Sequence, residues 1–281
     1  EQRSQTIAVI VPELGNNFFS QAIYGIEKVA REKGYHILIY ATGDEYEKEV
    51  SFIQHLHNGR AEGIIMSVSG EANDHNYLNE LAAKRLPLVF FDRVYEDICT
   101  PRVITNDYDS SFSATEHLIE QGCSRIAYLV INKNLSIGKT RMQGYIDALE
   151  KHQIPYDDKL VIDCSNSYEE NNVILKKMLK EVKPEGVFTS VERLAFATYY
   201  ACYDLNISIP KDLKVIGFSS LEIAPLLNPS LTTITQPATK IGVEAAALLF
   251  QMLESPESVN ADTKVVLNST LVQRRSTENR P

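Results

Sequence analysis

The sequence predicts an α/β protein built from two doubly wound, Rossmann-like domains with parallel sheets. Three observations lead to this fold class. The chain has 281 residues, more than one hydrophobic core usually holds. Strand-like and helix-like segments alternate from its beginning, which is typical of βαβ units. The alternation forms two successive runs of about five units each, which favours two sheets over one.

The first run opens with Thr6–Val11, a continuous apolar and β-branched segment typical of a strand that is buried on both faces. Apolar residues at helical spacing predict the helices, and Gly34 is placed to end the first of them. The further strands of this run are expected at His36–Ala41, Gly63–Met66 and Leu88–Phe91, and the helices at Phe18–Lys33, Tyr46–Asn58 and Asn73–Lys84.

The alternation restarts after Pro101 and continues almost to the end of the chain. Its strands are expected at Val103–Thr105, Arg125–Val130, Val161–Asp163, Gly186–Thr189 and Leu213–Gly217, followed by two short ones at Lys264–Leu267 and Ser269–Val272. Its helices are expected at Ser110–Gln121, Arg141–Lys151, Asn171–Val182, Leu194–Leu205 and Lys240–Glu254.

An eight-fold βα barrel is the competing α/β interpretation. It is less favoured because Pro229 and Pro237 interrupt the chain after Asn228, where a barrel would continue its regular alternation.

Composition and charge exclude several classes of protein. The hydrophobic fraction of 44% and the charged fraction of 23% are those of an ordinary globular protein. No apolar run approaches the ~20 residues that a membrane span needs, and residues 1–5 contain no signal-peptide core. The net charge of −9 argues against nucleic-acid binding by this segment, because phosphate contacts need clustered lysine and arginine.

The cysteines indicate neither a disulfide framework nor a metal site. The chain has four cysteines, which lie far apart and form no CxxC pair: Cys99, Cys123, Cys164 and Cys202. This spacing favours reduced thiols. His55 and His57 are two residues apart and would point to different faces of a helix, so they make poor metal ligands.

Enzyme signatures are incomplete. Ser136–Thr140 resembles the end of a phosphate-binding P-loop, but the glycine required five residues before Gly138 is Lys133. The stretch Gly217–Ser220 lacks the G-x-S-x-G pattern of a nucleophile elbow. No G-x-G-x-x-G follows the first strand, so no dinucleotide is expected. The sequence therefore predicts a protein with no catalytic set and no cofactor.

Ligands of doubly wound sheets bind at the carboxyl ends of the strands, often between domains. The positions of interest directly follow the predicted strands: Glu13–Phe19, Asp92-Arg93, Asn132–Arg141, Ser190–Arg193 and Ser219-Ser220. Several are polar or aromatic, as a small-molecule site requires.

Three of these segments have a structural interpretation beside the functional one. The pair Phe18-Phe19 could stack on a sugar or base, but spacing alone favours Asn17 as a helix cap followed by core aromatics. Asp92 and Arg93 could bind hydroxyls of a ligand, or form a structural ion pair. Arg141 would begin a helix, where its charge opposes the helix dipole, and the simplest alternative is a solvated surface charge.

Many short motifs, in order along nearly the whole chain, resemble the LacI/GalR family of transcriptional regulators. The opening Arg3–Pro12 is similar to the stretch after the family's hinge, and Asn16–Phe19 to its N-P-F-F, with Asn17 in place of proline. Further matches are Gly25–Glu27, Gly34-Tyr35, Gly63–Ile65, Phe91–Arg93, His117–Gly122, Arg125–Ala127, Arg141-x-x-Gly144-Tyr145, Ala148-Leu149, Ile209–Asp212, Val215–Phe218, Leu231–Ile234, Gln236-Pro237 and Leu271-Val272-x-Arg274.

The resemblance implies a type I periplasmic-binding-protein-like fold, in which the chain crosses three times between two subdomains, here near Asn106, Gln236 and Leu267. The expected N-terminal subdomain comprises residues 1–105 and 237–266, and the C-terminal one 106–236 and 267–281. The resemblance also implies a cytoplasmic bacterial homodimer. A small polar effector in the inter-subdomain cleft would change the subdomain angle, with the crossing segments as hinges, and so control a helix-turn-helix headpiece that is not in this sequence.

Carried over by motif, the effector-binding residues are Asn16, Phe18, Phe19, Asp92, Arg93, Arg141, Val191, Glu192, Ser219 and Gln236. Two positions depart from the family pattern. Val191-Glu192 stands where the family commonly has Asn-Asp, and Ser219 where it has the Asp of Gly-Phe-Asp. Because Val191 cannot hydrogen-bond through its side chain and Ser219 is short and neutral, we expect a modified sugar, another small polar molecule or a partner of Glu192 rather than a plain pentose or hexose.

Two other functions compete with this one. A periplasmic solute-binding protein of a sugar transporter shares the fold, but the hinge-like Arg3–Ile7 and the stretches Leu231–Pro237 and Leu271–Arg274 resemble regulators. A small-molecule enzyme on a doubly wound fold is the third possibility, because a fold does not determine function.

Overall fold

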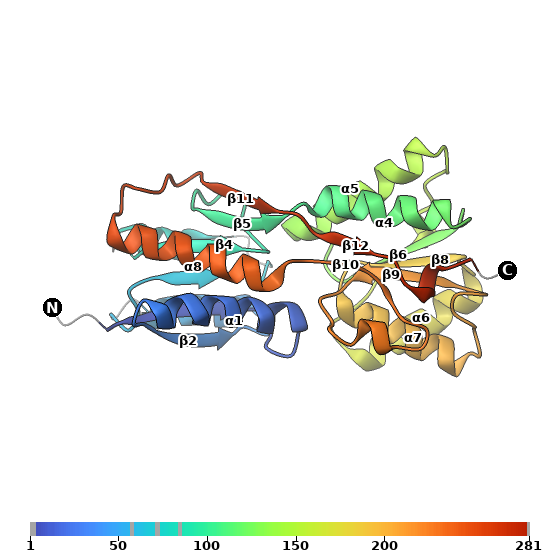
Figure 1. The fold of residues 1–281 in the computed structure, drawn as a ribbon, viewed down its shortest axis with the longest axis horizontal. Coiled ribbons are helices and arrows are strands. Elements are labelled where there is room, and N and C mark those ends of the chain that lie inside the picture. Colours follow the sequence, from blue (N-terminus) through green and yellow to red (C-terminus); the bar gives the residue numbers. More distant parts are fainter. Residues whose placement is uncertain (1–3, 57–58, 71–73, 84–85, 280–281) are drawn as a thin grey trace. The chain divides into compact units, whose positions relative to one another are not determined.

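The computed structural model describes residues 4–56, 59–70, 74–83 and 86–279. It divides the chain into two compact units, Glu1–Thr105 with Pro237–Leu267 and Asn106–Gln236 with Asn268–Pro281 (Figure 1). The expected boundary before residue 267 is one residue early, because Leu267 still pairs with Thr105 in the sheet of the first unit. The expected helix ends at Asn58 and Lys84, the expected helix start at Asn73 and the motif residue Arg3 lie outside the described residues.

The first unit is built around a six-stranded sheet in the order β11-β5-β4-β3-β1-β2, and every pair of neighbouring strands is parallel. Its strands are β1 (Thr6–Val11), β2 (His36–Ala41), β3 (Ile64–Met66), β4 (Leu88–Phe91), β5 (Arg102–Thr105) and β11 (Lys264–Leu267), and its helices α1 (Asn17–Glu32), α2 (Tyr46–Leu56), α3 (Asn76–Ala83) and α8 (Ala238–Glu254).

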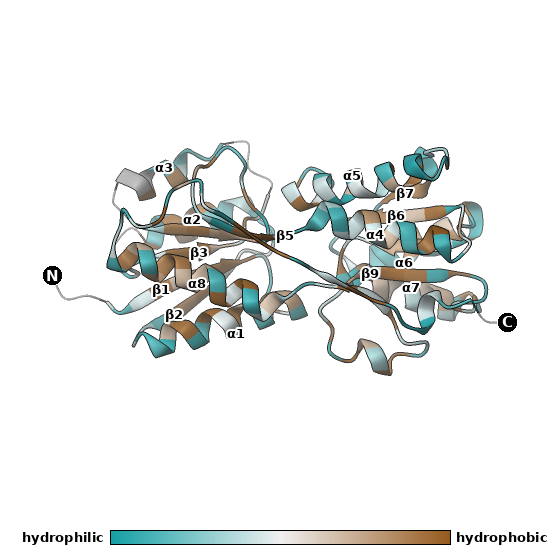
Figure 2. Ribbon diagram, turned by 45° about the horizontal axis from the view of Figure 1, so that its top comes forward, coloured by the Kyte–Doolittle hydropathy of each residue, from teal (hydrophilic) through white to brown (hydrophobic). Residues whose placement is uncertain are grey.

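The apolar runs of these strands are explained by burial on both faces of the sheet. Successive side chains of a strand point to opposite faces. Accordingly Ile7 and Val9 join one core with α1 and α8, whereas Ala8 and Ile10 join another with α2 and α3. Figure 2 shows the result as hydrophobic strands between helices of mixed character.

The second unit contains a six-stranded sheet in the order β12-β10-β9-β8-β6-β7. Its strands are parallel except for β12, which pairs antiparallel with β10. Its strands are β6 (Ile126–Val130), β7 (Val161–Asp163), β8 (Gly186–Thr189), β9 (Lys214–Phe218), β10 (Thr232–Thr235) and β12 (Thr270–Val272), and its helices α4 (Asp107–Glu120), α5 (Ser136–Lys151), α6 (Tyr168–Glu181) and α7 (Glu192–Asp204).

This sheet is covered on both faces by the same principle. Ala127 and Leu129 of β6 pack in a core with residues of α6 and α7, while Tyr128 and Val130 pack in a core with residues of α4 and α5. The two sheets confirm the predicted fold class of two doubly wound α/β subdomains.

Two predictions of secondary structure differ most from the observed elements. Strand β10 was not predicted, because Pro229 and Pro237 flank it and interrupt the regular alternation of strands and helices. Helix α5 begins at Ser136, five residues before the expected start at Arg141. Gly138 permits this early start, because a Cβ there would lie 2.2 Å from the carbonyl oxygen of Asn132.

Buried hydroxyl groups hold the C-terminal segment against the second unit. Nε2 of His117 in α4 lies 2.8 Å from Oγ1 of Thr277, and this oxygen lies 2.8 Å from Oγ1 of Thr232. Ser276 accepts a hydrogen bond from the Thr232 amide at 2.8 Å and donates one to the Val215 carbonyl at 2.6 Å. The 3₁₀ turn η3 (Arg275–Thr277) is therefore part of the core of the unit.

The environment of His117 predicts a loss of stability in mild acid. Burial lowers the pKa of His117 below its ordinary value of 6.5, so the folded state binds the proton more weakly than the unfolded state. The stability that neutral His117 contributes is then fully present above the pKa of the unfolded state. It is lost as the pH falls through the lower pKa of the folded state. We expect the free energy of unfolding to decrease as the pH falls through the ordinary histidine pKa of 6.5, and to decrease less in His117→Asn. Urea unfolding at several pH values measures this, with exposed His36→Asn as the control. An equal decrease in both variants would contradict the assignment to His117.

Candidate functional site

The residues predicted to bind a ligand follow the carboxyl ends of strands in both units. In each sheet the strand order reverses beside the second strand from one edge, which is β1 in the first unit and β6 in the second. Doubly wound sheets bind their ligands outside the carboxyl ends of the strands at such a point. We call Asn16, Phe18, Phe19, Asp92 and Arg93 the first-unit group, and Arg141, Val191, Glu192, Ser219 and Gln236 the second-unit group.

Asn16 and the two phenylalanines form the start of α1. Oδ1 of Asn16 accepts a hydrogen bond from the Phe18 amide at 2.9 Å, so Asn16 is the N-cap, and the prediction of Asn17 was one residue late. The rings of Phe18 and Phe19 are buried and meet edge to face, with centroids 5.2 Å apart. This segment is thus a capped helix start with core aromatics, as spacing alone favoured.

Arg93 forms an ion pair with Asp44, which the sequence analysis had not considered as a partner. Its Nη1 lies 2.5 Å from Oδ1 of Asp44, in a pair whose side chains are only 12% and 22% exposed. The Arg93 guanidinium lies 5.8 Å from the centroid of the Phe19 ring. Asp92 is buried and adopts a left-handed backbone conformation with φ of +60°. The structure therefore brings Phe18, Phe19 and Arg93 together.

Arg141 is buried, so the interpretation as a solvated surface charge was wrong. Its side chain is 3% exposed, and its Nε donates to Oδ1 of Asp107 at 2.6 Å. Its Nη1 donates to the Ser190 carbonyl at 2.6 Å, and its guanidinium carbon lies 3.7 Å from the centroid of the Phe218 ring. Charge-assisted hydrogen bonds in two directions and a ring against one face fix the guanidinium in one orientation.

Helices α4 and α5 lie side by side (Figure 1). Their close approach allows Arg141 of α5 to contact Asp107 of α4. Gly144 makes this approach possible, because a Cβ at this position would lie 2.4 Å from the Tyr108 carbonyl oxygen. The hydroxyl of Ser111 in α4 also donates to the backbone carbonyl of Arg141.

The two positions that depart from the family pattern contact one another. The Ser219 hydroxyl donates to Oε2 of Glu192 at 2.5 Å, and the same hydroxyl accepts a hydrogen bond from the Leu221 amide at 3.1 Å. Glu192 and Ser219 are both buried. Glu192 is the first residue of α7, where a negative charge is favoured by the helix dipole. Val191 is the N-cap of α7 and makes no side-chain cap bond.

Sequence reasoning missed Asp44 and Asp107, the carboxylates that hold the two arginines. Both follow strand ends, which is the signal that could have revealed them: Asp44 lies in the turn after β2, and Asp107 begins α4 shortly after β5. Gln236, the last predicted residue, is buried directly after β10.

Three of the four cysteines are buried and chemically protected. Burial raises the pKa of Cys123 to about 11 and that of Cys164 and Cys202 to about 12. These thiols are therefore protonated at neutral pH and unreactive. Cys99 is exposed.

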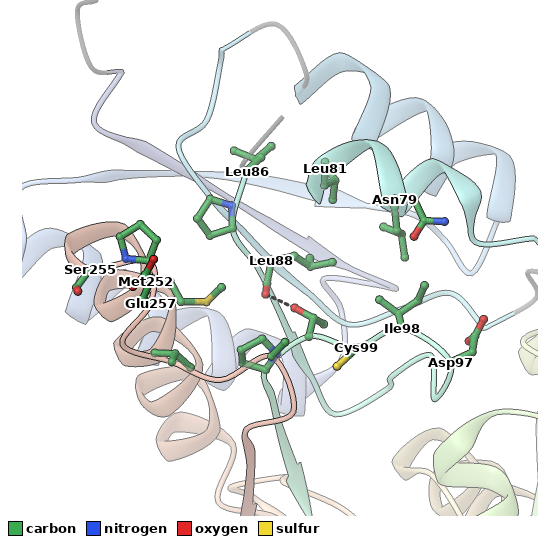
Figure 3. A pocket seen from close by; sticks show the side chains of 17 residues that line it. Asn79, Leu81, Leu86, Leu88, Asp97, Ile98, Cys99, Met252, Ser255 and Glu257 are labelled. Carbon is green, nitrogen blue, oxygen red and sulfur yellow. Dashed lines mark hydrogen bonds between the residues drawn. The ribbon is translucent and has the colours of Figure 1, made fainter. Parts of the chain in front are cut away.

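A pocket of about 1050 Å³ lies at the opposite end of the first unit's sheet from the first-unit group. It lies at the amino ends of β4 and β5, where Leu81, Leu88, Ile98 and Met252 supply an apolar lining (Figure 3). None of the predicted ligand-binding residues lines it.

Within the described ranges, no group of three or more histidine, cysteine, aspartate or glutamate side chains could hold a metal ion. No helix among the described residues is long and apolar enough to span a membrane.

Comparison with known proteins agrees with this architecture. HTH-type transcriptional regulator DegA of Bacillus subtilis (strain 168) is 28% identical over 277 residues, covering 98% of this chain and 82% of DegA. A ribose operon repressor of Halalkalibacterium halodurans is 28% identical over 284 residues, with coverage of 98% and 82%. A solved LacI family transcriptional regulator from Enterococcus faecium with bound ribose is 27% identical, with a TM-score of 0.87 over 96% of this chain and 98% of that one.

A family model described as periplasmic binding proteins and sugar binding domain of LacI family matches residues 4–274. This match spans nearly the entire chain and includes both units and all three segments that connect them. The chain therefore belongs to the family of periplasmic binding proteins and LacI-family sugar binding domains.

Proposed function

We propose that this chain is the effector-sensing and dimerising core of a bacterial, cytoplasmic LacI-family transcription regulator. It binds a small polar effector, a sugar or a sugar derivative, and contacts DNA through a headpiece outside this segment rather than through its own acidic surface. The relatives named above support this proposal, since both curated proteins are transcription regulators and the Enterococcus faecium regulator has ribose bound.

The observation that carries the proposal is the arrangement of Arg141. A buried guanidinium is costly unless it is paired, and here Asp107, the Ser190 carbonyl and the Phe218 ring fix it at the carboxyl ends of the strands. Such a preorganised arginine suits recognition of ligand hydroxyls or a carboxylate. The first-unit group would add Arg93 and its aromatic neighbours to the binding of the effector.

Two other functions compete with this proposal, that of a periplasmic solute-binding protein and that of a small-molecule enzyme. The family description also includes periplasmic binding proteins, so a solute-binding role is the second candidate. A signal peptide encoded directly upstream would favour that role, and a basic helix-turn-helix segment would favour the regulator. A non-enzymatic role is part of our proposal, and turnover of a bound ligand would contradict it.

A thermal-shift screen tests the ligand class. We expect a sugar derivative, sugar acid, sugar phosphate, nucleoside or amino acid to raise the melting temperature, because a ligand at a hundred times its dissociation constant adds ~2.7 kcal/mol of stability. The shift should disappear in Arg141→Ala and persist in Lys139→Ala, a control at an exposed position of the same helix.

The contact between Ser219 and Glu192 leads to a more specific expectation for the same screen. Because the Ser219 hydroxyl is already engaged with Glu192, plain pentoses and hexoses should bind more weakly than in the nanomolar range. Nanomolar binding of an unmodified sugar would contradict this part of the proposal.

Dimerisation is tested independently of the ligand. We expect size-exclusion chromatography with light scattering to give twice the chain mass of 31.6 kDa. A monomer at micromolar concentration would contradict the dimeric core without affecting the proposed effector site.

A further inference from the structure

Glu49 of α2 is a fully buried carboxylate that accepts hydrogen bonds from three separate segments of the first unit. It accepts from the Ser69 amide at 2.6 Å, from the Tyr95 hydroxyl at 2.8 Å and from the Tyr77 hydroxyl. Among the described residues, no lysine or arginine forms an ion pair with Glu49. A buried charge without a cationic partner depends on its hydrogen bonds, so these three donors carry the compensation.

The two tyrosine hydroxyls are suited to remain donors. Burial and the neighbouring Glu49 charge raise the pKa of Tyr77 and Tyr95 far above the ordinary value for a phenol. The ring of His75 also stacks on that of Tyr95, with centroids 3.8 Å apart, which restricts the Tyr95 side chain further.

Two of the three donors lie on the loops that support the first-unit group. Ser69 follows β3, and Tyr95 follows β4 two residues after Arg93. These loops are also joined directly, because the Val68 amide donates to the Arg93 carbonyl at 3.2 Å and the Arg93 amide lies 3.4 Å from Oγ of Ser67. A carboxylate that holds both loops thereby restrains the backbone from which Asp92 and Arg93 project.

Helix α2 links this arrangement to the partner of Arg93. Asp44, which pairs with the Arg93 guanidinium, lies in the turn immediately before α2. Glu49 is therefore bonded to the loop that carries Arg93, while its own helix follows the turn that carries Asp44. Helix α2 and the turn before it thus restrain both the backbone and the side chain of Arg93.

We infer that Glu49 is a positioning residue that fixes the loops after β3 and β4 and thereby sets the geometry of Arg93 for effector binding. Where it concerns effector affinity, the inference rests on the proposed function. Preorganised groups bind more tightly because less order is lost on binding. Loss of the Glu49 contacts should thus weaken ligand affinity through Arg93 and leave the sheet of the unit intact.

Hydrogen–deuterium exchange tests the structural half of this inference without a ligand. In Glu49→Gln, we expect amides of residues 67–70 and 92–96 to exchange at least tenfold faster. Peptides from β1 and from β6 in the second unit should be unchanged. Glu47→Gln is the matched control, because Glu47 is exposed on the same helix and loses the same charge. Unchanged loop exchange, or an equal acceleration throughout the first unit, would overturn the positioning role.

A double-mutant cycle tests the functional half, with D-ribose as the probe in calorimetric titrations. We expect Glu49→Gln and Arg93→Ala each to weaken ribose binding at least tenfold, and the double variant to bind no more weakly than Arg93→Ala. Additive losses would overturn the inference, because they would mean that Glu49 does not act through Arg93. An unchanged affinity in Glu49→Gln would overturn it as well.

The two failures are distinguishable. If Arg93→Ala binds ribose as well as the wild type, the proposed role of the first-unit group in binding is wrong. If the wild type does not bind ribose, the plain sugar is excluded as a ligand, and the exchange measurement decides the role of Glu49.

Discussion

Replacing Arg141 by methionine is expected to lower the stability of the second unit by about 3–5 kcal/mol, the typical cost of removing one partner from a buried ion pair. The side chain is 3% exposed, and its partner Asp107 is 5% exposed. The variant would lose the bond to Asp107, the bond to the Ser190 carbonyl and the contact with the Phe218 ring, all inside the unit. Urea unfolding followed by circular dichroism measures the change, and hydrogen exchange in the peptides of β6 and β8 assigns it to this unit.

Two further variants separate charge from geometry at this position. Arg141→Lys keeps the positive charge but cannot donate in two fixed directions, so we expect it to recover only part of the loss. Lys139→Met removes a positive charge at an exposed position of the same helix and should change stability by less than about 0.5 kcal/mol. A loss of under about 1 kcal/mol in Arg141→Met would mean that the buried pair contributes no more than an exposed one.

The architecture could be predicted from the sequence because burial on both faces makes parallel strands continuous in apolar residues. Thr6–Val11 and Leu88–Phe91 were predicted with the bounds that the structure shows for β1 and β4. Strand β10 was missed because Pro229 and Pro237 flank it and because it lacks such an apolar run. Its Thr232–Thr235 segment is polar in composition, yet Thr232 and Thr233 are buried. The C-terminal segment supplies their partners: the Thr232 amide donates to the Ser276 hydroxyl, the Thr232 hydroxyl donates to the Arg274 carbonyl, and the Arg274 guanidinium donates to the Thr233 hydroxyl. Such compensation by residues some forty positions away has no local signal.

The sequence could place the candidate residues after the carboxyl ends of strands, but it could not give the contacts among them. The rule that ligands lie at carboxyl ends of strands selected Asp92, Arg93 and Arg141. It could not reveal that Asp44 pairs with Arg93, because the two are 49 residues apart and meet only when β2 and β4 lie in one sheet. Nor could it show that Arg141 is buried, since the close packing of α4 and α5 depends on the surroundings of Gly144.

Close contact between two helices also predicts a large loss of stability when Gly242 in α8 is replaced. We expect Gly242→Ala to destabilise the first unit by about 2–3 kcal/mol, within the range for overpacking a core. A Cβ at Gly242 would lie 1.9 Å from the carbonyl oxygen of Ala22 in α1, and one at Gly25 would lie 2.2 Å from the carbonyl oxygen of Thr239 in α8. The two helices touch through backbone atoms on both sides, so neither can yield by rotating a side chain.

The sign of this change is what makes it informative. Helix propensity alone predicts that alanine stabilises a helix interior by about 1 kcal/mol relative to glycine, so a net loss can come only from packing. Ala247→Gly, at an exposed position of the same helix, supplies the matched control and should cost about 1 kcal/mol from propensity. Urea unfolding of both variants measures the comparison. If Gly242→Ala raised the free energy of unfolding, α1 and α8 would have room for a methyl group, and the contact between their backbones would not be what holds them at this distance.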